Sequence, residues 1–259
     1  RRTAITDFTA LTRTLMELFQ QNCVLTLLGE EVSSIEEHQE YVRICGGDTE
    51  VESSSLIVCG GLMADRLARM MNINLDFQII PFRGEYYRLM PEFNDIVSHL
   101  IYPIPDPDLP FLGVHLTLMI DGTVTVGPNA VLGWKREGYG SLNFDLKDVA
   151  EMVAFPGFWK VLRANLGTGF SEFLDSLYKP GYLKRVKKYC PQLRLADLSP
   201  YPAGIRAQAV MSDGELVHDF LFSETERSLH VCNAPSPAAT SALPIGAYLC
   251  DKAAEKFRL

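Results

Sequence analysis

Two arginine-bearing segments are the strongest candidates for binding an anionic substrate. In the first, residues 81–88 (PFRGEYYR), alternation along a strand places Arg83 and Tyr87 on one face. In the second, a glycine two positions before Arg206 leaves that side chain open space to reach a ligand. A guanidinium that faces a pocket binds a carboxylate in bidentate fashion. A half-exposed sheet edge with a salt bridge explains the first segment equally well.

His115 is the best candidate for a general base, because histidine ordinarily titrates near neutral pH. It stands alone in an apolar run at residues 113–117, where a histidine is more often a hydrogen-bonded core residue than a catalyst. His230 fits either situation. The remaining histidines lie in polar stretches and are expected at the surface: His38, His99 and His218.

Two turns carry the small residues that let a ligand approach the backbone. Gly60 and Gly61 follow the apolar run 56–59 and precede a helical pattern, so free helix amides lie next to a close backbone approach. Many α/β domains use such a pair merely to close a turn. Near the C-terminus, Ser236 is the expected cap of a helix and Pro237 its first residue, which offers unpaired amides to an electron-rich group. A well-capped terminal helix without a ligand is the alternative.

Hydrophobic periodicity predicts the elements that position these residues. The first part of the chain reads as a helix, strands and a further strand followed by a helix, at residues 7–21, 23–28, 41–45, 56–59 and 63–71. Strands then dominate, with a hairpin turn at Asp121-Gly122, at residues 77–89, 99–103, 113–119 and 123–126. A helical stretch precedes the last strands and a final helix, at residues 146–190, 205–210, 216–222, 229–232 and 236–257.

The composition is that of a globular protein. Of 259 residues, 47% are hydrophobic and 22% are charged, and the net charge is -8. These values exclude a disordered chain and argue against a nucleic-acid binder, which is usually basic. Six scattered cysteines without a CxxC pair argue against a metal site and a disulfide framework, and favour reduced thiols in a cytoplasmic setting.

Four segments, taken in order, resemble the FAD-dependent D-amino-acid-oxidase-like (DAO) superfamily, and within it the enzymes that oxidise L-2-hydroxyglutarate. They are PFRGEYY (81–87), YPIPDPDLPFLGVHLTLMIDGTVTVGPNAVL (102–132), PAGIRAQAV (202–210) and NAPSPAATSALPIG (233–246). The resemblance implies a mixed α/β fold. An incomplete Rossmann-like FAD-binding domain would comprise residues 1–78 and 201–259, and an antiparallel-sheet substrate-binding domain with helices would comprise residues 79–200.

The resemblance also implies a reaction, in which L-2-hydroxyglutarate is oxidised to 2-oxoglutarate by hydride transfer to flavin N5. Arg206 would bind the α-carboxylate of this 2-hydroxy dicarboxylate, His115 would be the base, and Arg83 or Tyr87 would bind the far carboxylate. The residues expected near FAD are Val32, Gly60, Gly61, Ser236, Pro237, Ala238, Ala239 and Thr240. Members of this family open with a strand and a GxGxxG turn that this sequence lacks, so we expect it to begin roughly a third of the way into the family's chain.

Residues 157–190 suggest where electrons could leave. Two acidic residues in this stretch are outnumbered by seven basic ones: Lys160, Arg163, Lys179, Lys184, Arg185, Lys187 and Lys188. Aromatic residues and leucines lie between them, which suits an element that meets anionic lipid at the inner membrane face, with a quinone or oxygen as acceptor. An ordinary helical subdomain explains the stretch equally well. An amino-acid oxidase of the same superfamily and an inactive fragment are the alternative functions, and the oligomeric state stays open.

Overall fold

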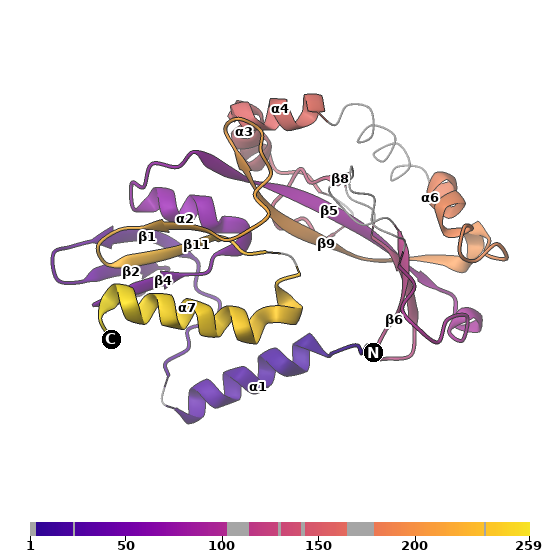
Figure 1. Cartoon of the computed structure of the whole chain (residues 1–259), viewed down its shortest axis with the longest axis horizontal. Helices are drawn as coiled ribbons and strands as arrows, with labels where there is room; N and C mark the ends of the chain where they lie inside the picture. The colour runs from indigo at the N-terminus through magenta and orange to yellow at the C-terminus, as the bar shows by residue number, and fades with distance from the viewer. Residues whose placement is uncertain are drawn as a thin grey trace. The chain divides into compact units, whose positions relative to one another are not determined.

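The computed structural model describes residues 4–22, 24–102, 114–128, 131–140, 143–164, 179–235 and 237–259. The chain forms two compact units, each described by itself below. Unit 1 comprises residues 1–6 and 80–207, and unit 2 comprises residues 7–79 and 208–259. The unit boundaries fall inside two long strands, β5 (Phe77–Leu89) and β9 (Leu198–Met211) (Figure 1). The assignment of the two units to substrate and cofactor stays a prediction.

Unit 1 is built on a five-stranded sheet in which β5 is central. The order is β6-β7-β5-β8, and β9 also pairs with β5. The three shorter strands are β6 (His115–Leu118), β7 (Val124–Gly127) and β8 (Val131–Leu132). The β6–β7, β7–β5 and β5–β8 pairs are antiparallel, which confirms the expected antiparallel sheet. The strand at 77–89 and the turn at Asp121-Gly122 are also confirmed, and Gly122 has a φ of 79° there.

The helices of unit 1 begin at recognisable residues. α3 (Leu146–Ala154) is capped by Asp145, whose side chain accepts from the backbone N–H groups of residues 147 and 148. α4 (Pro156–Ala164) begins with proline, which lacks the N–H that a first helical residue leaves unpaired. α6 (Lys179–Val186) and two short 3₁₀ helices, η2 (Pro91–Phe93) and η3 (Leu195–Asp197), complete the described elements.

The core of unit 1 lies between its sheet and α6. Tyr182, Leu183 and Val186 of α6 are buried and pack against apolar residues of β6 and β7. The hydroxyl of Tyr182 donates to the carbonyl of Val126 at 2.8 Å, so the buried phenol keeps a polar partner. Burial raises the pKa of Tyr182 far above its ordinary value. α6 is therefore fixed to β7 by a polar bond inside an apolar contact.

The described residues of unit 2 form two three-stranded sheets and three α-helices. The first sheet is antiparallel and comprises β1 (Val32–Glu37), β2 (Val42–Gly46) and β3 (Thr49–Ser53). In the second, β11 (Ser228–Asn233) pairs antiparallel with β10 (Leu221–Glu224) and parallel with β4 (Leu56–Val58). The helices are α1 (Phe8–Gln21), α2 (Ala64–Met70) and α7 (Ala242–Phe257), with 3₁₀ turns η1 (Gly61–Met63) and η4 (Ala239–Ser241). The mixed α/β fold is thus confirmed.

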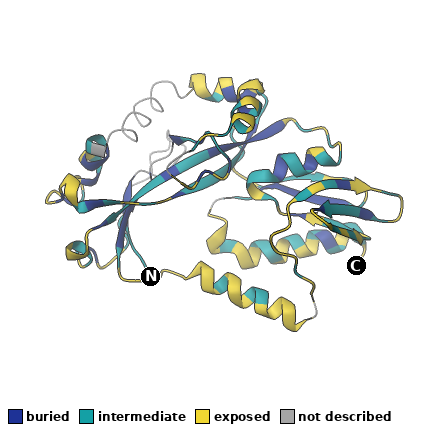
Figure 2. Ribbon diagram, turned by 180° about the vertical axis from the view of Figure 1, so that it is seen from behind, coloured by how far each residue is buried: buried dark blue, intermediate teal, exposed yellow. Residues whose placement is uncertain are grey.

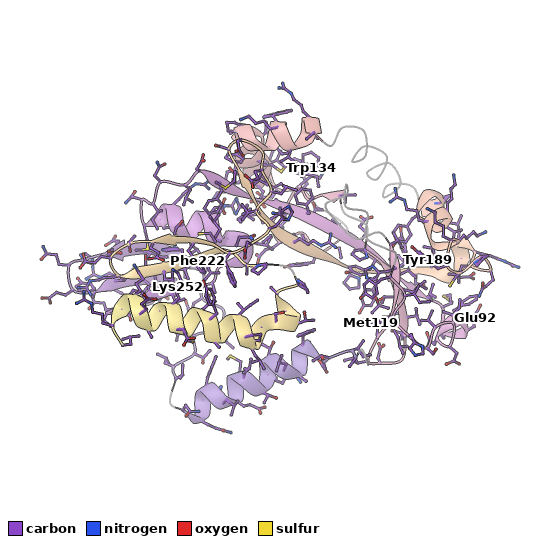
Figure 3. All side chains as sticks on the ribbon, in the orientation of Figure 1. Glu92, Met119, Trp134, Tyr189, Phe222 and Lys252 are labelled. Carbon is purple, nitrogen blue, oxygen red and sulfur yellow. The ribbon has the colours of Figure 1, made fainter. Side chains whose placement is uncertain are left out.

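Side-chain contacts fix two of these helices. The buried carboxylate of Asp65 on α2 accepts from Arg69 at 3.1 Å and from the backbone N–H of Ile79 at 3.3 Å. Lys252 of α7 lies 4.9 Å from the ring centre of Phe222 on β10, a cation–π contact (Figure 3). α2 is therefore tied to the start of β5, and α7 to β10.

α1 differs from the other described α-helices because none of its residues is buried. Asp7 caps it by accepting from the N–H of Ala10 at 3.0 Å, which confirms the predicted helix and its cap. Figure 2 shows exposed residues along its whole length. Among the described helices of the chain, none is both long and apolar enough to cross a membrane.

Several sequence predictions were wrong. The apolar run 24–28 forms no strand, and its leucines at 25 and 28 are each 78% exposed. The stretch expected at 99–103 contributes one bridge, between Ile101 and Leu116, in its described part. A short, wholly apolar run such as 56–59 predicts a strand buried on both faces, but β4 lies at the edge of its sheet and its Ile57 is 45% exposed. β1 and β3 were missed, since glutamate and serine make up most of both strands and give no apolar alternation.

Gly127 allows a first prediction. Its φ is 144°, and a Cβ there would lie 2.7 Å from the carbonyl oxygen of Glu85 and 2.9 Å from atoms of both Tyr86 and Tyr182. We expect Gly127→Ala to lower the free energy of unfolding by about 2 to 3 kcal/mol, because the new methyl group meets backbone and packed rings. Denaturant titration measures this. Gly140→Ala is the control, since nothing lies within 4 Å of its Cβ position, and an equal effect of both variants would contradict the prediction.

His230 allows a second prediction. It is 1% exposed, and its Nε2 lies 3.1 Å from Ser228 Oγ and 3.2 Å from the sulfur of Met71. Burial lowers its pKa, and the charge of Glu37 only partly opposes this. Below the ordinary histidine pKa of about 6.5, His230 is therefore protonated in the unfolded chain but still neutral in the folded chain. The contribution of His230 to stability is complete above that pH and is lost as the pH falls toward the folded pKa.

Unfolding free energies measured at a series of pH values test this. Relative to His230→Gln, the unaltered chain should lose up to about 1.4 kcal/mol per pH unit just below pH 6.5. Carboxylates titrate in both proteins, so the difference isolates the histidine. Parallel stability curves for the two proteins would contradict the prediction.

Candidate active site

Four polar side chains of unit 1 come together from three strands and one connecting segment. They are Tyr86 on β5, Tyr102, His115 on β6 and Arg206 on β9. The bridge between Ile101 and Leu116 places Tyr102 beside His115, and the two rings stack with their centres 4.2 Å apart. His115 itself is 9% exposed and pairs with Gly127 across the β6–β7 hairpin.

Tyr86 links this stacked pair to Arg206. Burial raises the pKa of Tyr86, the guanidinium of Arg206 opposes that rise, and Tyr102 adds to it. Its phenol is therefore protonated at neutral pH and can donate a hydrogen bond. Burial also lowers the pKa of Arg206, which Tyr86 partly offsets. A half-buried cation of this kind gains most from an anionic ligand, so the cluster is suited to binding a carboxylate.

Arg83 and Tyr87 have other partners. The guanidinium of Arg83 donates to the carbonyl of Gly138 and lies 3.6 Å from Glu85. Asn143 donates to the same carbonyl at 2.9 Å, so Arg83 helps to hold the loop that follows β8. The ring of Tyr87 packs edge-on against Tyr182 at 4.8 Å and joins the apolar core. These contacts do not include Arg206, and a role in binding the far carboxylate stays a prediction.

The residues expected near the cofactor all lie in unit 2. Val32 is half-buried at the start of β1. Gly60 is packed, because a Cβ there would collide with the side chain of Leu67. Gly61 differs: its φ is 50°, and nothing lies within 4 Å of its Cβ position. Open space above a glycine backbone is what the close approach of a ligand requires.

The expected start of the last helix was wrong. α7 begins at Ala242 with Ser241 as its cap, after the 3₁₀ turn η4, so Pro237 is not a first helical residue. Proline at 244 is tolerated in the first turn of the helix, where its missing N–H costs nothing. Residues 237–240 are exposed before and within η4, whereas Ser236 lies outside the described residues. The role of these backbone amides stays a prediction.

Tyr86 and Tyr102 are the cluster members that sequence reasoning missed. Alternation from Arg83 favours Tyr87, and nothing in the pattern shows that the neighbouring tyrosine faces Arg206. Tyr102 stands just before a proline-rich stretch, and the bridge beside it joins Ile101 to Leu116, which lies beyond that stretch. In the described parts of the chain, no group of three or more histidine, cysteine or acidic side chains is arranged to hold a metal ion.

Comparison with known proteins finds one matching family and several relatives of the chain. The profile of a family described as FAD dependent oxidoreductase matches residues 1–252. The chain is 54% identical over 251 residues to L-2-hydroxyglutarate dehydrogenase of Escherichia coli (strain K12), covering 96% of this chain and 59% of that protein. It is 57% identical over 223 residues to the Salmonella houtenae protein of the same name, covering 86% and 53%. The chain thus spans less than two thirds of the length of these relatives.

A solved structure gives the same fold. Dithionite-reduced L-alpha-glycerophosphate oxidase from Mycoplasma pneumoniae, with FAD bound, is similar with a TM-score of 0.67 and 18% sequence identity. The match covers 96% of this chain and 55% of that one. At this identity the likeness supports the fold alone.

Proposed function

The chain belongs to the FAD dependent oxidoreductase family, a family of redox enzymes, and from this premise we propose that the whole protein oxidises L-2-hydroxyglutarate to 2-oxoglutarate with FAD as cofactor. The observation that carries the proposal is the 54% identity to the Escherichia coli L-2-hydroxyglutarate dehydrogenase over nearly the whole chain. The cluster of Arg206, Tyr86, Tyr102 and His115 supports it, because it combines a cation with groups that can donate or accept a proton.

Arg206 is proposed to bind the α-carboxylate of the substrate. Two parallel N–H donors match the two oxygens of a carboxylate, and a half-buried site strengthens that pairing relative to water. Binding the carboxylate fixes the neighbouring carbon, which carries both the hydroxyl and the hydrogen to be removed. Orientation of that carbon is the main contribution expected of Arg206.

His115 is proposed to accept the hydroxyl proton. Loss of that proton is needed as the carbon–oxygen bond becomes a carbonyl, and a neutral imidazole is suited to take it. Stacking on Tyr102 fixes the plane of the imidazole ring. The base and the carboxylate anchor thus come from different strands of one sheet.

FAD, when bound, supplies the acceptor for the hydride that leaves the substrate carbon. Gly61 fits such a group, because its open backbone would admit a large planar or phosphate-bearing ligand that a side chain would block. Gly60, Val32 and the exposed amides at 237–240 are the other residues of this chain proposed to lie near it.

Substitutions at Arg206 and His115 test the proposed roles in the flavin-loaded whole protein. We expect His115→Asn to lower kcat by about a hundredfold or more, since a general base typically contributes that much. We expect Arg206→Met to raise KM for L-2-hydroxyglutarate by at least about tenfold, since a charged hydrogen bond is lost. Steady-state assays with a dye acceptor measure both effects.

A substrate screen accompanies the assay. Oxidation of an L- or D-amino acid in preference to L-2-hydroxyglutarate would overturn the proposed substrate. Near-normal turnover by His115→Asn would remove the histidine from the reaction. Bound flavin is measured in each variant, so that a loss of cofactor is not taken for a loss of chemistry.

We further propose that electrons pass to a quinone at the membrane surface, with contact made by α4. Within the stretch 157–190 that was expected to meet lipid, two of the described aromatic residues do not face it. Phe158 and Tyr182 are buried. Trp159 and Leu162 of α4 are 44% and 39% exposed, and Lys160 and Arg163 lie on the same helix. The aromatic residues at 170–178 lie outside the described residues. Exposed apolar side chains beside lysine and arginine suit an anionic lipid surface.

Vesicle sedimentation tests this contact. We expect Lys160→Glu/Arg163→Glu to weaken binding to anionic vesicles by about thirtyfold or more, since two basic residues that each contribute roughly 1 kcal/mol near such a surface are lost. Arg13→Glu/Arg258→Glu in unit 2 is the charge-matched control, because it also reverses two charges and both arginines are exposed. Binding that is unchanged in the double variant, or absent from the unaltered protein at low salt, would contradict the proposal.

A further inference from the structure

The ring of Tyr86 is held between two glycines. A Cβ at Gly127 of β7 would lie 2.9 Å from Cδ1 of the tyrosine, and a Cβ at Gly204 of β9 would lie 3.8 Å from Cε2. These two carbons are on opposite edges of the ring. Backbone that carries no side chain therefore borders both edges, and the direction of the phenolic oxygen is fixed by the sheet.

The same geometry places the tyrosine ring on the face of β9 that carries the cation. Gly204 and Arg206 are two residues apart on β9 and therefore share a face of the strand. Tyr86 lies on that face, since its ring borders the Cβ position of Gly204. The mutual influence of Tyr86 and Arg206 on their pKa values agrees with this proximity.

From this geometry we infer that Tyr86 is a specificity-determining residue, whose hydroxyl donates a hydrogen bond to the carboxylate that Arg206 binds. The inference rests on the proposed function of Arg206 and adds a second donor to it. A carboxylate accepts up to about four hydrogen bonds, so it can take two from a guanidinium and a third from a phenol. A ligand with an amide or ester in place of this carboxylate offers weaker acceptors and no charge. The pair of Arg206 and Tyr86 therefore selects a free carboxylate.

Binding of glutarate to the flavin-loaded whole protein tests the inference, because glutarate has both carboxylates but no hydroxyl to oxidise. We expect Tyr86→Phe to raise the dissociation constant, measured by calorimetry, about tenfold or more. Tyr201→Phe is the matched control on β9, since its ring, rather than its hydroxyl, lies against the Arg88 guanidinium at 4.8 Å. Its dissociation constant should stay within about twofold of the unaltered protein.

A double-mutant cycle shows whether the two groups act on one carboxylate. In the Arg206→Met background, Tyr86→Phe should change glutarate binding less than about twofold, since the ligand group that both side chains hold is already lost. Full additivity of the two losses, or a Tyr86→Phe variant that binds glutarate as tightly as the unaltered protein, would overturn the inference. Binding of glutaramide should be weak and insensitive to Tyr86→Phe.

If Tyr86→Phe does not fold, two variants of Gly204 test the inferred role of Tyr86 instead. Gly204→Ala makes an ordinary contact with the tyrosine ring and should bind glutarate normally. Gly204→Val fills the space beside the ring and should lose at least about tenfold in affinity. Equal affinities for this pair would overturn the inference.

Failure of the proposed function has a different signature. A protein that does not oxidise L-2-hydroxyglutarate, yet binds glutarate in a manner that depends on Tyr86, refutes the proposed reaction and leaves the inference standing. An unaltered protein that binds no glutarate refutes the inference as well.

Discussion

The pairing of β5 with three other strands is the constraint on which unit 1 depends. β7, β8 and β9 all hydrogen-bond to β5, so each side chain of β5 meets residues that are distant in sequence. Tyr86 meets Arg206 in this way, Tyr87 meets Tyr182, and Arg83 meets the loop at Gly138. Three positions within a five-residue stretch of one strand thus serve a polar cluster, an apolar core and a loop.

Burial of charge gives this arrangement its chemistry. A guanidinium that loses part of its hydration is held less favourably than one in water, and the pKa of Arg206 falls accordingly. Tyr86 compensates in part for this loss, since its influence raises the pKa of Arg206 again. A cation that the fold already holds in place binds an anion with little reorganisation.

Sequence signals predicted those parts of the fold that depend on neighbours in the chain. Asp7 and the apolar spacing after it predicted α1, and Asp121-Gly122 predicted the hairpin that positions His115. β1 and β3 were not predicted because both strands are mostly polar. Their pairing with β2 defines them, and no local sequence pattern shows that pairing. Arg206 and His115 could be named from residue type, whereas Tyr86 could not, because the pairing of β5 with β9 is what brings it to Arg206.

Gly60 and Gly61 look interchangeable in the sequence, but they are under different constraints. At Gly60 a Cβ would meet the end of the Leu67 side chain, so an added side chain requires that leucine to move. At Gly61 the space is open and the backbone φ of 50° is one that asparagine also adopts. A side chain at position 60 therefore displaces a packed neighbour, whereas one at position 61 projects into open space and disturbs nothing but its own backbone conformation.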